Sequence, residues 1–115
     1  MKQINGQELI GMAPPAADAA GTALPLLLDV REPWEFALAA IRIEGLQTLS
    51  MPMSSVPERL AELAPAQPVV CICHHGARSA QVVAFLERRG FEAAYNLAGG
   101  IDAWSLQVDT TVPRY

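Results

Sequence analysis

The sequence is short of cysteine, of aromatic residues and of long apolar runs. Its two cysteines, Cys71 and Cys73, are too few for a secreted domain held together by several disulfides. No apolar run approaches the ~18 residues that a membrane-spanning helix requires. The residues that follow Met1 lack the apolar stretch of a signal peptide. We therefore expect a cytoplasmic protein, in which cysteine remains a thiol.

Charge is also sparse: charged residues make up 17% of the chain, and the net charge is −4. This acidic balance argues against a nucleic-acid partner and against a membrane partner, because both require a basic field on the protein. Hydrophobic residues make up 51% of the 115 residues, which is enough to fill the core of one domain. We expect a single domain over residues 1–115, with an extended tail at 109–115.

Short apolar runs alternate with amphipathic stretches along the chain. Strands are expected at residues 3–4, 24–30, 46–51, 69–72 and 94–97, and helices at 7–12, 33–37, 59–63, 79–89 and from 99 onwards. Ser55 and Glu58 have the spacing of a capping box before the third of these helices. Residues 13–22, rich in Ala, Pro and Gly, are expected to form a loop. The alternation predicts an α/β fold with a mostly parallel central sheet and helices on both faces.

Residues 73–79, Cys-His-His-Gly-Ala-Arg-Ser, join the clearest expected strand to the clearest expected helix. In open α/β sheets, sites form beyond the carboxyl ends of the strands, where this loop would lie. Backbone N–H groups and the helix N-terminus favour an anion there, while Gly76 permits tight curling and Arg78 adds a fixed positive charge. Because these groups favour a thiolate, we expect Cys73 to be a catalytic nucleophile.

Three groups of motifs resemble those of the single-domain rhodaneses, a family of sulfurtransferases. They are residues 28–32 (LDVRE) with 34–36 (WEF), residues 73–79, and residues 90–91 (GF) with 96–101 (NLAGGI) and 103–104 (AW). Their order and spacing match the family over nearly the whole chain. One departure is Ala40, which stands where the family usually has a histidine, and we expect a local rearrangement between residues 37 and 53.

The resemblance implies a rhodanese-like domain and a thiosulfate sulfurtransferase that works in two steps through a persulfide on Cys73. The donor would be thiosulfate or another small sulfur donor, and the acceptor would be cyanide, a thiol or a protein persulfide. Such a reaction needs no metal and no organic cofactor. The residues expected to bind the substrate are His74, His75, Gly76, Ala77 and Arg78. The residues expected to support the loop are Asp29, Arg31 and Ser79.

Loop length separates sulfur transfer from phosphate chemistry. Four residues lie between Cys73 and Arg78, whereas cysteine phosphatases usually have five residues between these positions. The smaller loop suits a single sulfur atom, so a phosphatase or an arsenate reductase is disfavoured. An alternative of another class is a sulfur carrier or interaction module that a protein partner loads, because the short chain has no second domain to shape a substrate pocket.

Cys71 and the histidines allow further interpretations. Cys71 lies within an apolar strand, so core packing is favoured over a redox role. Because side chains alternate along a strand, Cys71 and Cys73 share a face, which makes exchange between the two thiols conceivable but not favoured. A metal site formed by Cys71, Cys73, His74 and His75 is not expected, because all four come from one five-residue stretch whose side chains alternate in direction.

The charges around the loop give two more expectations. His74 and His75 stand where many relatives carry a fixed cation. The affinity for an anionic donor should therefore fall as the pH rises and these histidines become neutral. Arg78 is expected to pair with Asp29 or Glu32, which would fix the loop in addition to supplying positive charge.

Overall fold

The structure is a computed structural model and describes residues 1–14 and 23–115, so most of the expected loop at 13–22 lies outside it. Its strands are β1 (Lys2–Ile4), β2 (Leu26–Asp29), β3 (Thr48–Ser50), β4 (Val69–Ile72) and β5 (Ala94–Leu97). Its α-helices are α1 (Gly6–Ile10), α3 (Pro33–Leu38), α4 (Ala77–Arg88) and α5 (Gly100–Gln107), and η1 (Met53–Ser55) and η2 (Leu60–Glu62) are 3₁₀ helices.

The five strands form one sheet in the order β1-β5-β4-β2-β3, and every neighbouring pair is parallel. This confirms the predicted α/β fold. β4 lies in the middle of the sheet, where Cys71 is in register with Leu28 of β2 and Asn96 of β5. The carboxyl end of β4 therefore lies between the ends of two other strands, the position where a site is expected in such a sheet.

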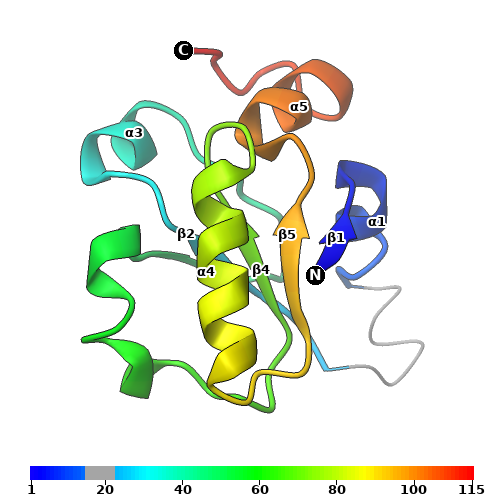
Figure 1. Ribbon diagram of the computed structural model, residues 1–115. Coiled ribbons are helices and arrows are strands. Elements are labelled where there is room, and N and C mark those ends of the chain that lie inside the picture. Colours follow the sequence, from blue (N-terminus) through cyan, green and yellow to red (C-terminus); the bar gives the residue numbers. More distant parts are fainter. Residues whose placement is uncertain (15–22) are drawn as a thin grey trace.

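Helices cover both faces of the sheet (Figure 1). Along β4, Val69 and Cys71 join a core cluster with α4, while Val70 and Ile72 join a second cluster with α1 and α5. This alternation follows from the period of two along a strand, and the two apolar faces explain why the strand has no polar side. Figure 1 also shows α3, α5, the N-terminal end of α4 and the C-terminus gathered at the carboxyl edge of the sheet.

The helix predicted at 59–63 is wrong: the chain there contains only the short 3₁₀ turns η1 and η2. The N–H of Arg59 reaches the carbonyl of Ser55 at 3.0 Å, but Pro57 has no N–H with which to continue an α-helical ladder. Pro65 follows within two turns, so the stretch is too short for a helix to offset the cost of its nucleation. The capping-box spacing therefore does not mark a helix.

The C-terminal segment folds back over the carboxyl edge of the sheet. The chain turns after α5, where the N–H of Val112 bonds to the carbonyl of Asp109 at 3.1 Å. The hydroxyl of Ser105 donates to the carbonyl of Val112 at 2.5 Å, and the side chain of Val112 is buried. This packing brings Tyr115 against the residues around Cys73, so the segment is more than the extended surface tail that we expected from its composition.

Candidate active site

The cysteine loop, residues 73–78, lies at the carboxyl end of the central strand β4. β4 ends one residue before Cys73, and α4 begins at Ala77, two residues earlier than predicted. The Sγ atom of Cys73 accepts a hydrogen bond from the N–H of Gly76 at 3.0 Å and is 3.2 Å from the hydroxyl of Ser79. The donor at the sulfur, the N–H of Gly76, favours negative charge on it.

Gly76 provides the turn of the loop. Its φ of 108° lies in the left-handed region, which side chains with a Cβ rarely adopt. A Cβ at this position would meet the N atom of Gly99 at 3.6 Å, an ordinary contact, so backbone conformation rather than space requires glycine. Gly76 is also the N-cap of α4 and has no side chain to satisfy the first N–H groups of that helix. Those groups and the positive end of the helix dipole are available to an anion.

The side chain of Asn96 on β5 contacts both Gly76 in the cysteine loop and Ser79 in α4. Its side-chain amide donates to the carbonyl of Gly76 at 3.1 Å, and its Oδ1 lies 2.5 Å from the hydroxyl of Ser79. Since a hydroxyl has one proton, Ser79 donates either to Asn96 or to the sulfur of Cys73. Asn96 was noted in the sequence only as part of a motif. A buried polar side chain inside a short strand was the signal that could have identified it.

Arg78 pairs with Glu35 of α3, which corrects the expected pairing with Asp29 or Glu32. The two guanidinium–carboxylate distances are 2.6 Å and 2.9 Å, and the Glu35 side chain is buried. This bidentate bond to Arg78 lowers the pKa of Glu35 to about 2, and the carboxylate in turn raises the pKa of Arg78 further above its ordinary value. Glu32 serves instead as the N-cap of α3, so the carboxylate that reaches Arg78 lies one helical turn further on.

Arg31 binds both carboxylate oxygens of Asp29, which explains why Asp29 does not pair with Arg78. Its guanidinium donates to the two Asp29 oxygens at 2.9 Å and 2.6 Å, and to the carbonyl of Ala39 at 2.6 Å. Both side chains are almost fully buried. The pair ties the end of β2 to the segment after α3, where the sequence predicted a local rearrangement. Bonds to Asp29 keep the pKa of Arg31 above its ordinary value despite the opposing effect of burial.

Tyr115 is a residue of the site that sequence reasoning missed. Its hydroxyl donates to Glu35 at 2.6 Å and accepts from Arg31 at 2.9 Å. Its ring stacks on His74, with centroids 4.1 Å apart and planes inclined by 7°. Burial and the bond to Glu35 raise the pKa of Tyr115. No local pattern in the sequence marks this contact, because it joins residues separated by most of the chain.

His74 and His75 lie on the same side of the loop instead of alternating in direction. Their rings stack with centroids 4.0 Å apart, and the Nε2 of His75 lies 3.8 Å from an oxygen of Asp102 in the first turn of α5. Burial, followed by the neighbouring His75, lowers the pKa of His74. A histidine with a lowered pKa is neutral near pH 7, so the fixed positive charge of the loop comes from Arg78.

The two cysteines are equally hidden but chemically different. Cys73 is 1% exposed and Cys71 is 0% exposed. Burial in the apolar sheet, together with the charge on Cys73, raises the pKa of Cys71 to about 12. Cys71 therefore remains a protonated thiol at neutral pH, in line with a role in core packing.

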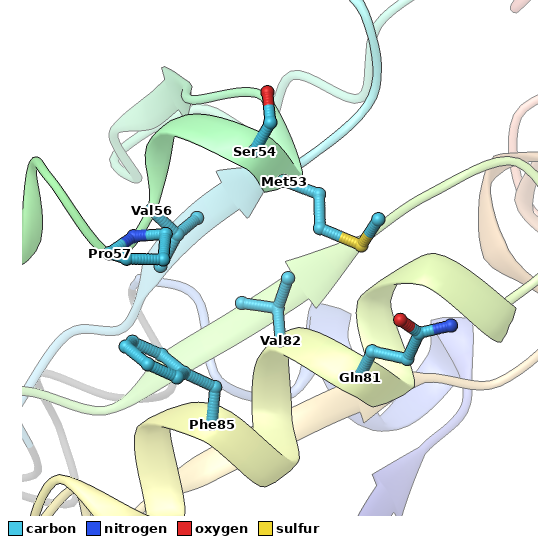
Figure 2. Close-up of a pocket in the computed structure, with 7 residues that line it drawn as sticks. All are labelled: Met53, Ser54, Val56, Pro57, Gln81, Val82 and Phe85. Carbon is cyan, nitrogen blue, oxygen red and sulfur yellow. The ribbon is translucent and has the colours of Figure 1, made fainter.

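An apolar pocket of about 290 Å³ lies between η1 and α4, away from the cysteine loop (Figure 2). Figure 2 shows Met53, Val56 and Pro57 on one side of the pocket, and Val82 and Phe85 of α4 on the other. None of the residues that line it belongs to the cysteine loop. The residues that line the pocket thus include no ionisable side chain.

Fold and site together define an α/β domain with one cysteine in a loop that leads into a helix N-terminus. A family model described as "Rhodanese-like domain" matches residues 13–107, and the chain belongs to this family. Within the described residues, no helix has the length and apolar character needed to cross a membrane.

The curated relatives include proteins named as sulfurtransferases. "Sulfurtransferase" of Allochromatium vinosum is 40% identical over 80 residues, which are 70% of this chain and 71% of that protein. "Rhodanese-like/PpiC domain-containing protein 12, chloroplastic" of Arabidopsis thaliana is 37% identical over 89 residues, 77% of this chain. The chain spans only 30% of the length of that plant protein. These relatives place the chain in a family of sulfurtransferases.

Solved structures agree with the fold. The rhodanese-like domain protein of Staphylococcus aureus superposes with a TM-score of 0.74 at 28% identity, covering 100% of this chain and 99% of that one. A rhodanese-related protein of Thermoplasma volcanium also gives a TM-score of 0.74 at 28% identity, with 94% of each chain covered. The predicted rhodanese-like architecture is therefore confirmed.

Proposed function

We propose that this protein transfers a sulfane sulfur from thiosulfate, or from a persulfide donor, through a persulfide on Cys73. The observation that supports this most is the hydrogen bond that the N–H of Gly76 donates to the Cys73 sulfur at 3.0 Å. Such a donor stabilises a negatively charged sulfur both before the reaction, as a thiolate, and after it, as a persulfide anion.

The proposed reaction has two displacement steps. The Cys73 thiolate attacks the outer sulfur of thiosulfate, the sulfur–sulfur bond of the donor breaks, and sulfite leaves with the electron pair. A persulfide anion then remains on Cys73. The acceptor attacks the outer sulfur of this persulfide, and the Cys73 thiolate returns as the leaving group. Cyanide would become thiocyanate, and a thiolate would become a persulfide, so ping-pong kinetics are expected.

The remaining loop residues would bind the donor. Arg78 supplies a permanent positive charge, and α4 begins at Ala77 with N–H groups that have no acceptor inside the helix. His74 and His75 would contact the sulfonate end of thiosulfate as hydrogen-bond donors. Since burial lowers the pKa of His74, its positive charge contributes less to donor binding near neutral pH than that of an ordinary histidine.

Three further side chains would support the loop without touching the donor. Asp29 and Arg31 form the buried pair that anchors the end of β2. Ser79 connects the Cys73 sulfur to Asn96 on the neighbouring strand. These contacts hold the sulfur and its donors in one arrangement, which lowers the reorganisation needed during the transfer.

The size of the loop supports sulfur transfer over phosphate chemistry. Four residues lie between Cys73 and Arg78, and the loop closes tightly enough for the N–H of Gly76 to lie 3.0 Å from the sulfur. A phosphoryl group has three equatorial oxygens to accommodate, whereas a persulfide adds one atom. We therefore expect no hydrolysis of aryl phosphates.

The decisive experiment is the intact mass of the full chain after incubation with thiosulfate. The reduced protein should gain one sulfur atom, and a subsequent addition of cyanide should remove it and release thiocyanate. Protein whose Cys73 has first been alkylated is the control and should gain nothing.

Two outcomes would contradict the proposal. Unmodified mass after incubation with thiosulfate and with a small persulfide donor would exclude direct loading of Cys73 by a small donor. Cysteine-dependent release of phosphate from an aryl phosphate would favour the phosphatase alternative. Loading by a protein persulfide but by neither small donor would instead indicate a carrier loaded by a partner.

A further inference from the structure

The cysteine loop and α5 bring Asp102 beside the consecutive residues His74 and His75. His74, His75 and Asp102 each offer a ligand atom, and these atoms all lie within 4.8 Å of one another. We propose that His74, His75 and Asp102 form a binding site for a divalent cation of the zinc class beside the mouth of the cysteine loop. No metal site was expected from the sequence, because Cys71, Cys73, His74 and His75 come from one short stretch and Asp102 lies far from them along the chain.

The backbone holds the three residues in this arrangement. The N–H of Asp102 donates to the carbonyl of His74 at 3.1 Å, and the N–H of Ile101 donates to the carbonyl of Cys73 at 2.9 Å. These bonds fix the start of α5 against the loop. The two imidazole rings already lie on one side, so closing around an ion requires side-chain rotation but no backbone movement.

The carboxylate of Asp102 has support from outside the site. Arg114 donates from Nε to Oδ1 of Asp102 at 3.0 Å, while Oδ2 lies 3.8 Å from Nε2 of His75. Ligating carboxylates in proteins are commonly held by such an outer hydrogen bond. The positive charge of Arg114 opposes the cation, so the site should bind less tightly than a closed structural zinc site.

The donor set selects the class of metal. Two imidazole nitrogens and one carboxylate oxygen suit zinc and its transition-metal neighbours, whereas calcium and magnesium prefer oxygen ligands throughout. Three protein ligands leave one tetrahedral position open for water or an anion. One of the ligands, His74, directly follows Cys73 in the sequence, but the Cys73 thiol would not bind the ion.

Zinc binding to the full chain, measured by calorimetry, tests this site independently of any sulfur transfer. We expect one zinc ion per chain in the wild type, and also in Cys73→Ser, which lacks the thiol. His75→Gln and Asp102→Asn should each weaken binding by about tenfold or more. Glu87→Gln, which removes an exposed carboxylate on α4, is the matched control and should bind as the wild type does.

Three results would overturn the inference. Loss of binding in Cys73→Ser would show that zinc binds to the thiolate. Unchanged binding in both His75→Gln and Asp102→Asn would place the ion elsewhere. Weakening by His75→Gln alone would remove Asp102 from the ligand set. Circular dichroism of each variant establishes that it is folded, and because Cys73→Ser binds metal in this scheme, failure of the proposed sulfur transfer would leave the test intact.

Discussion

Cys71 and Cys73 stand two residues apart on one face of the central strand, and both side chains are shielded from solvent. Apolar side chains surround Cys71 within the sheet, whereas the sulfur of Cys73 accepts from a backbone N–H and lies beside a hydroxyl. The pKa of Cys71 rises to about 12 because of burial. The difference teaches that the two cysteines of this protein are distinguished by the neighbours of their sulfur atoms and not by their exposure.

The largest effect should come from exchanging the two cysteines for unreactive residues. Cys73→Ser should abolish loading of sulfur from thiosulfate, because a serine hydroxyl is not ionised at neutral pH and forms no persulfide. Cys71→Ala should retain most of the loading, since the Cys71 thiol is protonated and takes no part. Intact mass after incubation with thiosulfate measures both.

Stability has to be controlled in this comparison, because Cys71→Ala leaves a small cavity in the core at a cost on the order of 1 kcal/mol. Urea unfolding of both variants would show that each is folded under the conditions of loading. If Cys71→Ala lost the persulfide while Cys73→Ser kept it, the assignment of the two roles would be reversed.

The next effect concerns Glu35, which holds Arg78 and therefore the loop around Cys73, but touches nothing near Cys71. The pKa of Glu35 is about 2 in the folded protein and 4.5 in its ordinary state, so the unfolded chain binds the proton first as the pH falls. The pair therefore stabilises the fold fully above about pH 4.5 and loses this contribution as the pH falls towards 2. Its full contribution is about 3 kcal/mol.

Urea unfolding of Glu35→Gln and of the wild type at several pH values tests this. The free energy of unfolding should differ by about 3 kcal/mol at pH 7, and the two proteins should converge near pH 2. Glu62→Gln is the control, because its ion pair with Arg59 is exposed and should change stability little. A constant difference at every pH would show that the loss comes from packing and not from the charge of Glu35.

A smaller effect is expected from Ser79→Ala, which removes the hydroxyl that links the Cys73 sulfur to Asn96. A buried polar group that loses its partner costs about 1–3 kcal/mol, so the rate of loading should fall by up to about tenfold as the support of the loop weakens. Ser105→Ala is matched in residue type and burial, but its hydroxyl bonds to the carbonyl of Val112, away from the loop. Equal loading rates in the two variants would remove Ser79 from the site.

The fold followed from local patterns where these were strong. The β-branched run of β4 and the amphipathic pattern of α4 predicted both elements, because period and length agree with one structure in each case. The region between β3 and β4 shows the limit of this reasoning. The capping-box residues Ser55 and Glu58 had the correct spacing, but Pro57 between them and the short connection prevented an α-helix.

Only the part of the site that consists of consecutive residues could be predicted from the sequence. The cysteine loop, its glycine and its arginine are consecutive, so the sequence displayed them together. The partners of the loop come from three other elements: Glu35 from α3, Asn96 from β5 and Tyr115 from the C-terminal segment. Choosing Glu35 over Glu32 required the direction of α3 relative to the loop, which tertiary packing determines and the spacing of residues does not.

The start of α5 has a consequence for protein engineering. A Cβ on Gly100 would collide with the carbonyl groups of Cys73 and His74, and the next two N–H groups of α5 bond to those same carbonyls. The backbone of the loop is therefore fixed from outside. Inserting a fifth residue before Arg78 to admit a phosphoryl group would displace both carbonyls, so a designer would have to rebuild the first turn of α5 as well.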